Sequence, residues 1–373
     1  MNINDFHIVY ISFGSNKGKK LFNIIKALKE IEIQLGRIDK ISSLYKTKSW
    51  GFNSRDFYNG CLILKTRFSP KLVLKKLKHI ELSIGRLKNP SQDYQSREID
   101  LDILFFDQLI VDSNELKIPH PQIAKRNFVL VPMLELSPDL THPKNNFSIK
   151  SLLLKSEDNL EIKKIKNNNF YIPFWERFPF VSIEGNIGAG KSTLSKKFKY
   201  HFEIEELKEN FTNNPFLKKF YLKPEEFALK TENYFLNDRK NQIIKHFFGF
   251  PKRKTVSDFW IGKSLVFAKN NLSKNSYKKL HNDFIKLNRI LIHPKIIIYL
   301  NQNILQLKKQ IAERGRSYEK NISEDYLKSI SKGYKFIFDK NQNFILIILT
   351  PHEVLELKSS QGLERLFRKI INL

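Results

Sequence analysis

A glycine-rich segment halfway along the chain constrains the fold more than any other feature. Residues 185–193 read Gly-Asn-Ile-Gly-Ala-Gly-Lys-Ser-Thr and match the phosphate-loop pattern G-x-x-x-x-G-K-[ST] in full. The apolar run 180–183 before the motif predicts a buried strand, and residues 194–198 after it predict a helix. In that order, backbone N–H groups and the helix N-terminus converge on phosphate oxygens. We therefore expect an α/β phosphate-loop fold whose phosphate-binding residues are Gly185, Gly188, Gly190, Lys191, Ser192 and Thr193, with Ser192 also a ligand of Mg²⁺.

The position of this motif indicates a second domain before it. The chain has 373 residues, 41% of them hydrophobic, which is enough for two cores. A polar stretch at 163–169 predicts a linker. We expect domains at 1–160 and 171–373.

Cysteine content and hydropathy indicate the compartment. Cys61 is the sole cysteine in the sequence, so an internal disulfide is impossible. The first residues lack a basic segment followed by an apolar run, and the roughly 20 consecutive apolar residues that span a bilayer are absent. We expect a cytoplasmic protein without a membrane partner.

The net charge of +27 has two explanations. One is nucleic-acid binding, and the other is a lysine-rich composition with cations gathered around anionic nucleotides. The lysines are scattered through the sequence, and helix-turn-helix, zinc-finger and RNP signatures are absent. We favour the second explanation and expect no nucleic-acid partner; a basic nucleic-acid-binding protein is a remote alternative.

The first half alternates between strand and helix patterns. Strand-like runs occur at 6–13, 38–49, 57–67 and 99–106, and apolar residues recur at helical spacing over 21–35 and 69–85. The resulting order β-α-β-β-α-β predicts an α+β domain with the ferredoxin-like arrangement. A pair of short strands is expected within 108–118, and a short helix at 148–154.

Two acidic residues stand out on the last of these strands. The period of two puts Asp100 and Asp102 on one face and the apolar residues between them on the other. Two carboxylates at this spacing can hold Mg²⁺ beside a polyphosphate. Taken alone the pattern is weak, because a solvated polar strand face looks the same.

The first half resembles 6-hydroxymethyl-7,8-dihydropterin pyrophosphokinase of the folate pathway. The Asp100/Asp102 strand and the segments 13–16, 42–47, 56–59, 80–82, 118–121 and 125–128 carry the resemblance. That family transfers pyrophosphate from ATP to the pterin hydroxymethyl group and releases AMP. The resemblance implies that Asp100 and Asp102 are catalytic and bind two Mg²⁺. It implies ATP contacts from Arg86, Arg97, His120 and Arg126, and pterin contacts from Phe57, Asn59 and Phe128.

One loop departs from the family pattern. Between Arg86 and Arg97 the family often carries several basic residues and a tryptophan, where this chain has Asp93 and Tyr94. An acid near triphosphate weakens its binding. We therefore expect a slower pterin reaction than is usual in the family, which Asp93→Arg would accelerate.

The second half resembles the deoxynucleoside kinases. Its strand-like runs at 255–258, 295–300 and 343–349 lie between helical segments, as in a parallel sheet covered on both faces. The resemblance rests on 183–193, 214–221, 231–239, 257–258, 263–268 and the lid segment 314–319. That family transfers the γ-phosphoryl group of Mg·ATP to a deoxynucleoside 5′-hydroxyl. Deoxyadenosine is one candidate substrate, and a homodimer is implied.

The same resemblance assigns residues in this half. Glu209 is the implied general base, although Glu205 and Glu206 lie within a register shift of three or four residues. Arg314 is expected to be catalytic and Arg316 to bind phosphate, both closing over the developing charge. The implied nucleoside contacts are Lys230, Arg239 and Asp258. Lys230 stands where relatives commonly carry a base-reading glutamine, so a lysine here would favour a base edge rich in acceptors.

Two alternatives are open for the second half. One is a nucleoside-monophosphate kinase, against which the Arg-Gly-Arg lid and the Asn-Pro-Phe-Leu segment at 214–217 argue. The other is a non-catalytic module in which nucleotide binding regulates the first domain. AMP production with a pterin and ADP production with a nucleoside would distinguish them from the two-enzyme interpretation.

Overall fold

A computed structural model describes residues 6–49, 54–86, 95–166, 170–340 and 343–373. These residues form two compact units. The first contains the described residues up to Phe174 together with His201–Glu203 and Glu364–Leu373. The second contains Trp175–Tyr200 and Ile204–Leu363. Apart from the segments at 201–203 and 364–373, the division falls between Phe174 and Trp175.

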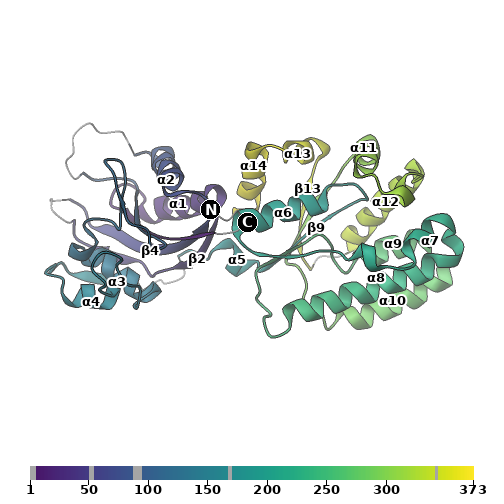
Figure 1. Cartoon of the computed structure of the whole chain (residues 1–373), viewed down its shortest axis with the longest axis horizontal. Coiled ribbons are helices and arrows are strands. Elements are labelled where there is room, and N and C mark those ends of the chain that lie inside the picture. Colours follow the sequence, from purple (N-terminus) through teal and green to yellow (C-terminus); the bar gives the residue numbers. More distant parts are fainter. Residues whose placement is uncertain (1–5, 50–53, 87–94, 167–169, 341–342) are drawn as a thin grey trace. The chain divides into compact units, whose positions relative to one another are not determined.

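The first unit is built on an antiparallel sheet (Figure 1). Its strands follow the order β5-β1-β4-β3-β8, and β2 also pairs with β4. Helices α1 (Lys20–Gln34) and α2 (Pro70–Ile84) connect them in the expected β-α-β-β-α-β sequence. The strands of this sheet are β1 (His7–Ser15), β2 (Arg37–Ile41), β3 (Tyr45–Thr47), β4 (Phe57–Thr66), β5 (Asp100–Phe106) and β8 (Ile162–Lys164).

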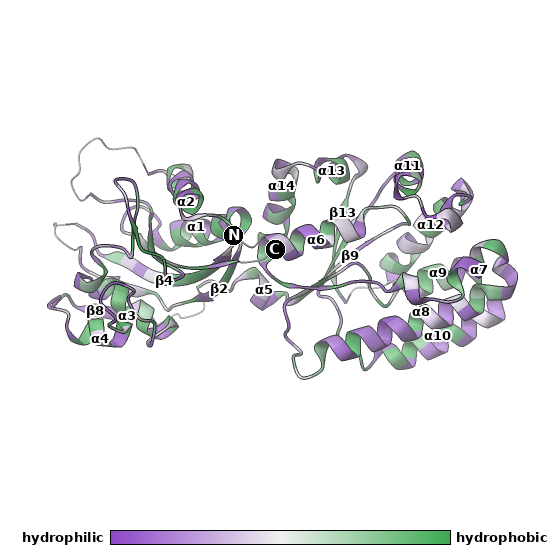
Figure 2. Cartoon of the chain, viewed as in Figure 1, coloured by the Kyte–Doolittle hydropathy of each residue, from purple (hydrophilic) through white to green (hydrophobic). Residues whose placement is uncertain are grey.

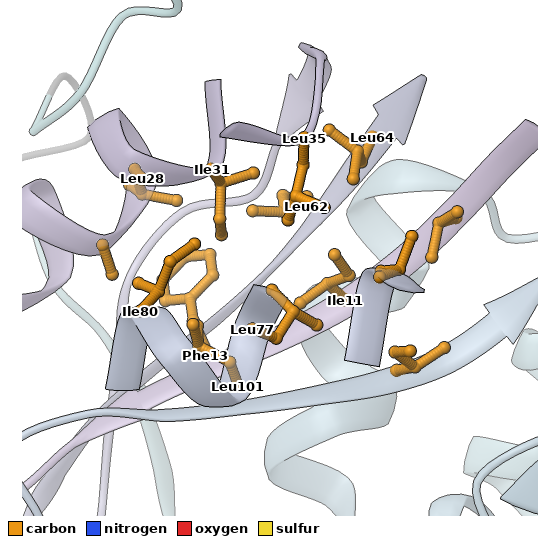
Figure 3. Close-up of a cluster of buried hydrophobic side chains, with 14 of the residues drawn as sticks. Ile11, Phe13, Leu28, Ile31, Leu35, Leu62, Leu64, Leu77, Ile80 and Leu101 are labelled. Carbon is orange, nitrogen blue, oxygen red and sulfur yellow. The ribbon is translucent and has the colours of Figure 1, made fainter. Parts of the chain in front are cut away.

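Successive side chains along each strand point to opposite faces of the sheet, so each face has its own hydrophobic core. Figure 3 shows Leu28 and Ile31 of α1 and Leu77 and Ile80 of α2 gathered around strand residues such as Ile11. The opposite face of the sheet packs against α3 (Asn127–Leu136) and α4 (Ile149–Leu154). The remaining elements of this part are β6 (Val111–Asp112), β7 (Lys117–Ile118) and the 3₁₀ turn η1 (Ile123–Lys125).

Most expected elements of this unit are present, but two interpretations were wrong. The run 38–49 is divided into β2 and β3, both of which pair with β4. The start of the expected polar linker at 163–169 is the edge strand β8, which pairs with β3. Its sequence Ile-Lys-Lys does not alternate between apolar and polar residues, so it carries no strand signal. An edge strand does not need this alternation, because it is held by backbone hydrogen bonds and its side chains face solvent. The expected short strands in 108–118 and the helix in 148–154 are confirmed.

The second unit contains a parallel sheet, as expected. Its order is β10-β11-β9-β12-β13, and each neighbouring pair is parallel. The strands are β9 (Phe180–Gly185), β10 (Glu205–Leu207), β11 (Thr255–Ser257), β12 (Ile296–Leu300) and β13 (Ile345–Leu349). The sequence pattern missed β10, because its residues Glu-Glu-Leu lack an apolar run. The phosphate loop follows β9, in the middle of the sheet.

Amphipathic helices cover this sheet. Figure 2 shows hydrophobic and hydrophilic residues alternating along α10, whose Leu280 and Phe284 are buried in the core of the unit. The helices of this unit are α5 (Phe174–Arg177), α6 (Lys191–Phe202), α7 (Leu217–Leu222), α8 (Pro224–Phe247), α9 (Lys263–Asn271), α10 (Lys274–Asn288), α11 (Ile304–Arg314), α12 (Glu324–Lys340) and α13 (Pro351–Glu356), with 3₁₀ turns η2 (Phe211–Asn213) and η3 (Ser317–Glu319). The last helix, α14 (Ser360–Ile371), begins in this unit, and its residues from Glu364 onward belong to the first unit. Over the described residues, none of the helices combines the length and apolarity needed to cross a membrane.

Candidate active sites

A cavity in the first unit collects most of the residues expected to bind a pterin and ATP. It lies at the end of the sheet where β1, β4 and β5 meet. Seven of the expected residues contribute to its wall: Phe57, Asn59, Arg97, Asp100, Asp102, Arg126 and Phe128. Arg86 and His120 contact the two aspartates without being part of that wall as the structure describes it.

The two aspartates have different neighbours. Asp100 Oδ1 accepts hydrogen bonds from Arg97 at 2.7 Å and Arg86 at 2.9 Å. Asp102 Oδ2 lies 3.9 Å from both His120 Nε2 and Arg126. Leu101, between them, faces the core. The strand thus presents two carboxylates surrounded by cationic and imidazole groups, as the period-two pattern predicts.

Electrostatics make this pair receptive to a cation. Partial burial and the nearby charge of Asp100 raise the pKa of Asp102 to about 7. Burial, and then the charge of Arg126, lower the pKa of His120 to about 4, so its imidazole is neutral at pH 7. His120 Nδ1 accepts the backbone N–H of Gln122, so Nε2 carries the proton toward Asp102. The repulsion between two carboxylates is relieved by a hard cation with oxygen ligands, and the donor set therefore fits Mg²⁺.

Asn59 is held in position by neighbours that the sequence comparison did not single out. Its Nδ2 donates to Thr47 Oγ1 at 2.8 Å, which orients the amide. A Cβ atom at position 14 would lie 2.5 Å from Asn59 Oδ1, so only glycine leaves room for this side chain. Gly14 belongs to the Phe-Gly-Ser-Asn segment at 13–16, and its close approach to Asn59 explains the glycine there.

Sequence reasoning also missed the role of Glu81. This carboxylate is buried, accepts the backbone N–H of Leu101 at 2.8 Å and binds Arg86. Burial raises the pKa of Glu81 to about 7. Glu81 therefore fixes both the strand between the aspartates and the arginine that contacts Asp100. The departing loop residues Asp93 and Tyr94 lie outside the described residues.

A second cavity, of about 560 Å³, surrounds the phosphate loop in the second unit. The loop residues Gly188 and Gly190 have φ values of 79° and 94°, which a side chain would disfavour. Lys191 Nζ donates at 2.9 Å to the backbone carbonyl groups of Gly185 and Asn186. Burial lowers the pKa of Lys191 to about 8. Among the expected residues, Gly188, Gly190, Lys191, Ser192, Thr193, Glu209, Arg239, Asp258, Arg314 and Arg316 line the cavity.

A chain of contacts runs from the loop into the cavity. Ser192 Oγ donates to Asp258 Oδ2, and Asp258 Oδ1 accepts the backbone N–H of Glu209 at 2.7 Å. Asp258 was expected to contact the nucleoside. In the structure it joins the loop hydroxyl to the segment that carries Glu209, so its carboxylate lies beside the phosphate loop.

Of the three acids considered for the general base, Glu205, Glu206 and Glu209, it is Glu209 that lines the cavity. It accepts hydrogen bonds from Arg239 at 2.6 and 2.9 Å and lies 2.6 Å from Lys263 Nζ. Burial alone would raise the pKa of Glu209, but Lys263 and Arg239 outweigh it and hold the pKa well below its usual range. The two other candidates for the general base lie elsewhere: Glu206 accepts a hydrogen bond from Ser195, and Glu205 is exposed on β10. Lys263 was not predicted as a site residue.

The two lid arginines share one partner. Arg314 and Arg316 both contact the carboxylate of Glu319, which is 5% exposed. The guanidinium carbon of Arg316 also lies 3.6 Å from the centre of the Phe211 ring. Glu319 therefore holds both cations at the wall of the cavity.

Lys230 corrects one expectation. Its side chain is exposed, and its Nζ lies 5.2 Å from the centre of the Phe227 ring. The described wall of the phosphate-loop cavity does not include it. Nine residues separate Lys230 from Arg239, which at 100° per residue puts them on opposite sides of α8. The structure thus places Lys230 on the side of α8 away from Arg239, in a separate open hollow with Phe216 and Tyr234.

Two family models match the chain. The model described as 7,8-dihydro-6-hydroxymethylpterin-pyrophosphokinase matches residues 10–138, and the deoxynucleoside kinase model matches residues 181–372. These spans enclose the two cavities. Both families are ATP-dependent phosphotransferases.

Individual relatives match either the first or the second half of the chain. A 2-amino-4-hydroxy-6-hydroxymethyldihydropteridine pyrophosphokinase of Aquifex aeolicus is 40% identical over 139 residues, covering 36% of this chain and 83% of that protein. A deoxyguanosine kinase of Bacillus subtilis is 33% identical over 159 residues, covering 42% of this chain and 77% of that protein. A solved deoxyadenosine kinase from M. mycoides is 26% identical, covers 52% of this chain and all of that protein, and has a TM-score of 0.46. The family models and the two sequence relatives show that the chain belongs to two enzyme families, with a hydroxymethylpterin pyrophosphokinase domain followed by a deoxynucleoside kinase domain.

Proposed function

We propose that the chain catalyses two separate ATP-dependent transfers, one to a pterin alcohol and one to a deoxynucleoside. The observation that carries this proposal is the presence of two cavities, each with its own phosphate-binding chemistry. One has the Asp100/Asp102 pair and arginines, and the other has the phosphate loop with Glu209. The proposed domains span 1–160 and 171–373, and the strand order of the first supports a ferredoxin-like classification.

In the first site, 6-hydroxymethyl-7,8-dihydropterin is the proposed acceptor. Phe57 and Phe128 supply aromatic surfaces for the flat ring, and Asn59 supplies an amide for its polar edge. The hydroxymethyl oxygen attacks the β-phosphorus of ATP, the bond to the α–β bridging oxygen breaks, and AMP leaves while the hydroxyl proton passes to solvent. Arg97 and Arg126 neutralise triphosphate charge during this transfer.

Mg²⁺ is the proposed cation at both sites. Asp100 and Asp102 would hold it in the first, and Ser192 with Asp258 in the second. When bound, the cation neutralises phosphate charge and orients the oxygens that react.

In the second site, a deoxynucleoside 5′-hydroxyl is the proposed acceptor. Lys191 and the loop N–H groups bind the β- and γ-phosphates, and Arg314 and Arg316 bind the transferred group. Glu209, kept ionised by Lys263 and Arg239, accepts a hydrogen bond from the 5′-hydroxyl and orients it toward the γ-phosphorus. Because such transition states are loose, orientation matters more than basicity, and the low pKa of Glu209 is compatible with this role. We further propose a cytoplasmic homodimer.

The two activities can be separated in the full chain. Asp102→Ala should abolish AMP formation with the pterin alcohol and spare ADP formation with deoxynucleosides. Lys191→Ala should lower the nucleoside reaction by about 10²–10³-fold and spare the pterin reaction. The activity that each variant is expected to keep shows that the chain is folded. A wild type that forms neither product would refute the proposal, and loss of both activities in either variant would refute the assignment of separate sites.

A further inference from the structure

Glu232 is a buried acid whose hydrogen bonding is incomplete. It lies on α8, is 2% exposed, and accepts a hydrogen bond from Asn271 Nδ2 at Oε1 over 2.8 Å. Its other carboxylate oxygen, Oε2, is buried without a hydrogen-bond partner among the residues that the structure describes. Buried polar atoms are nearly always paired, so an unpaired carboxylate oxygen suggests a missing ligand.

The helix that carries Glu232 also supplies part of the phosphate-loop cavity. Phe235 and Arg239 line that cavity, and they follow Glu232 by three and seven residues. Residues at this spacing lie along one face of a helix. Glu232 therefore continues the cavity-facing side of α8 by one turn beyond Phe235.

The partner of Glu232 extends the cavity wall in the same way. On α9, which packs against α8 (Figure 1), Lys263 and Phe267 line the cavity. Asn271 follows Phe267 by four residues, on the same helix face. The two cations of Glu209 lie over these rings, Arg239 over Phe235 and Lys263 over Phe267, and Glu232 and Asn271 lie one turn beyond the rings on their helices. A nucleoside with its 5′-hydroxyl at Glu209 directs its base toward the two phenyl rings and then Glu232.

The surroundings of Glu232 can accommodate its charge. Burial, together with the charge of Glu209, raises the pKa of Glu232 to about 7, while the hydrogen bond from Asn271 and the cations of Arg239 and Lys263 favour the ionised form. Asn271 is itself oriented, because its Oδ1 accepts a hydrogen bond from Tyr326 at 2.9 Å. A ligand that donates an N–H group to Oε2 would complete the hydrogen bonding and stabilise the carboxylate.

We propose that Glu232 reads the nucleoside base and that its acceptor-only carboxylate selects the edge of guanine, which presents two adjacent N–H donors. Adenine and cytosine present a donor beside an acceptor. A glutamine amide, which both donates and accepts, would match this pair, whereas a carboxylate, which only accepts, would match the donor alone. The inference rests on the proposed nucleoside kinase activity and specifies its substrate. Glu232 takes over the role for which Lys230 was expected.

The test compares Glu232→Gln with wild type in the full chain. Steady-state kcat/KM is measured for deoxyguanosine and deoxyadenosine under the same Mg·ATP conditions. Wild type should prefer deoxyguanosine, and Glu232→Gln should change the ratio of the two kcat/KM values by at least about tenfold toward deoxyadenosine, since one matched base contact contributes about 5–150-fold. Glu226→Gln, an exposed acid on the same helix, should leave the ratio unchanged.

The outcomes separate this inference from the proposed activity. An active wild type with the same ratio in Glu232→Gln would overturn the base-reading role alone, as would a wild-type preference for deoxyadenosine. A wild type that phosphorylates no deoxynucleoside would overturn the kinase activity and the inference with it. If Glu232→Gln is too unstable to purify, Glu232→Asp and Glu232→Asn repeat the comparison with side chains of matched length. The pterin reaction of each variant reports that the rest of the chain is folded.

Discussion

Glu209 and Lys263 form a buried ion pair in which the carboxylate lies 2.6 Å from the lysine Nζ. Glu209 comes just after β10 and Lys263 begins α9, so the pair joins segments 54 residues apart. With Arg239 on the same carboxylate, the pair holds Glu209 in its ionised form at the centre of the kinase cavity.

Lys263→Met should move the acid limb of the nucleoside reaction to higher pH. The folded-state pKa of Glu209 lies below its unfolded value of about 4.3, so its ion pairs stabilise the fold above that pH and the stabilisation is lost as the pH falls through the folded-state pKa. Removing Lys263 raises the folded-state pKa. The kcat/KM profile between pH 5 and 8 measures the shift, and Lys269→Met, an exposed lysine of α9, is the control. An unchanged profile would contradict the role given to Lys263.

Glu209→Gln should lower kcat for nucleoside phosphorylation by about 10²-fold or more, because a neutral amide pairs poorly with the cations of Lys263 and Arg239 and is no longer held where it orients the 5′-hydroxyl. The pterin activity of the same molecules should be unaffected. Quantifying ADP and AMP from parallel reactions checks both statements at once. A kcat within a factor of three of wild type would exclude Glu209 as the group that orients the hydroxyl.

Gly14→Ala should weaken pterin binding. The added methyl group would overlap Asn59 Oδ1 and displace the amide from Thr47. One lost hydrogen bond corresponds to about a tenfold rise in KM for the pterin. Thr47→Val removes the acceptor that orients Asn59 without adding bulk at position 14, so it should change KM in the same direction. If both variants keep the wild-type KM, Asn59 does not contact the pterin.

Glu81→Gln should lower kcat of the pterin reaction by about tenfold while leaving nucleoside phosphorylation intact. Glu81 Oε1 accepts both the Leu101 N–H and the Arg86 guanidinium, so an amide oxygen can still accept the Leu101 N–H, but it lacks the negative charge that holds Arg86 beside Asp100. Transition-state contacts of this kind contribute to kcat more than to KM. Glu115→Gln, an exposed acid in the same unit, is the matched control. A change confined to KM would argue for ground-state binding instead.

Glu319→Gln should slow phosphoryl transfer by freeing the lid arginines. Both Arg314 and Arg316 take their orientation from the Glu319 carboxylate, and a neutral amide satisfies neither fully. We expect kcat to fall by about tenfold or more. Asp325→Asn, a 93% exposed acid on α12, should behave like wild type. Equal rates for the two variants would show that Glu319 does not position the lid arginines for phosphoryl transfer.

The sequence by itself determined the features that depend on local spacing. The phosphate loop needs only glycines, a lysine and a serine at fixed positions between a strand and a helix, and all of these lie within nine residues. The shared face of Asp100 and Asp102 follows from the period of two in a strand. The element order of the first unit was predictable because its helices and most of its strands carry a clear apolar period.

Tertiary structure alone decided which distant residues meet. Lys263 reaches Glu209, Glu81 reaches Leu101, and Asn271 reaches Glu232 only after helices pack on their sheets and on each other, and a one-dimensional pattern contains no such distances. Helix packing also reversed one assignment: Lys230 faces outward while Glu232, two residues later, is buried. A rotation of 100° per residue separates the two positions, and which of them meets the cavity depends on how α8 is rotated against α9.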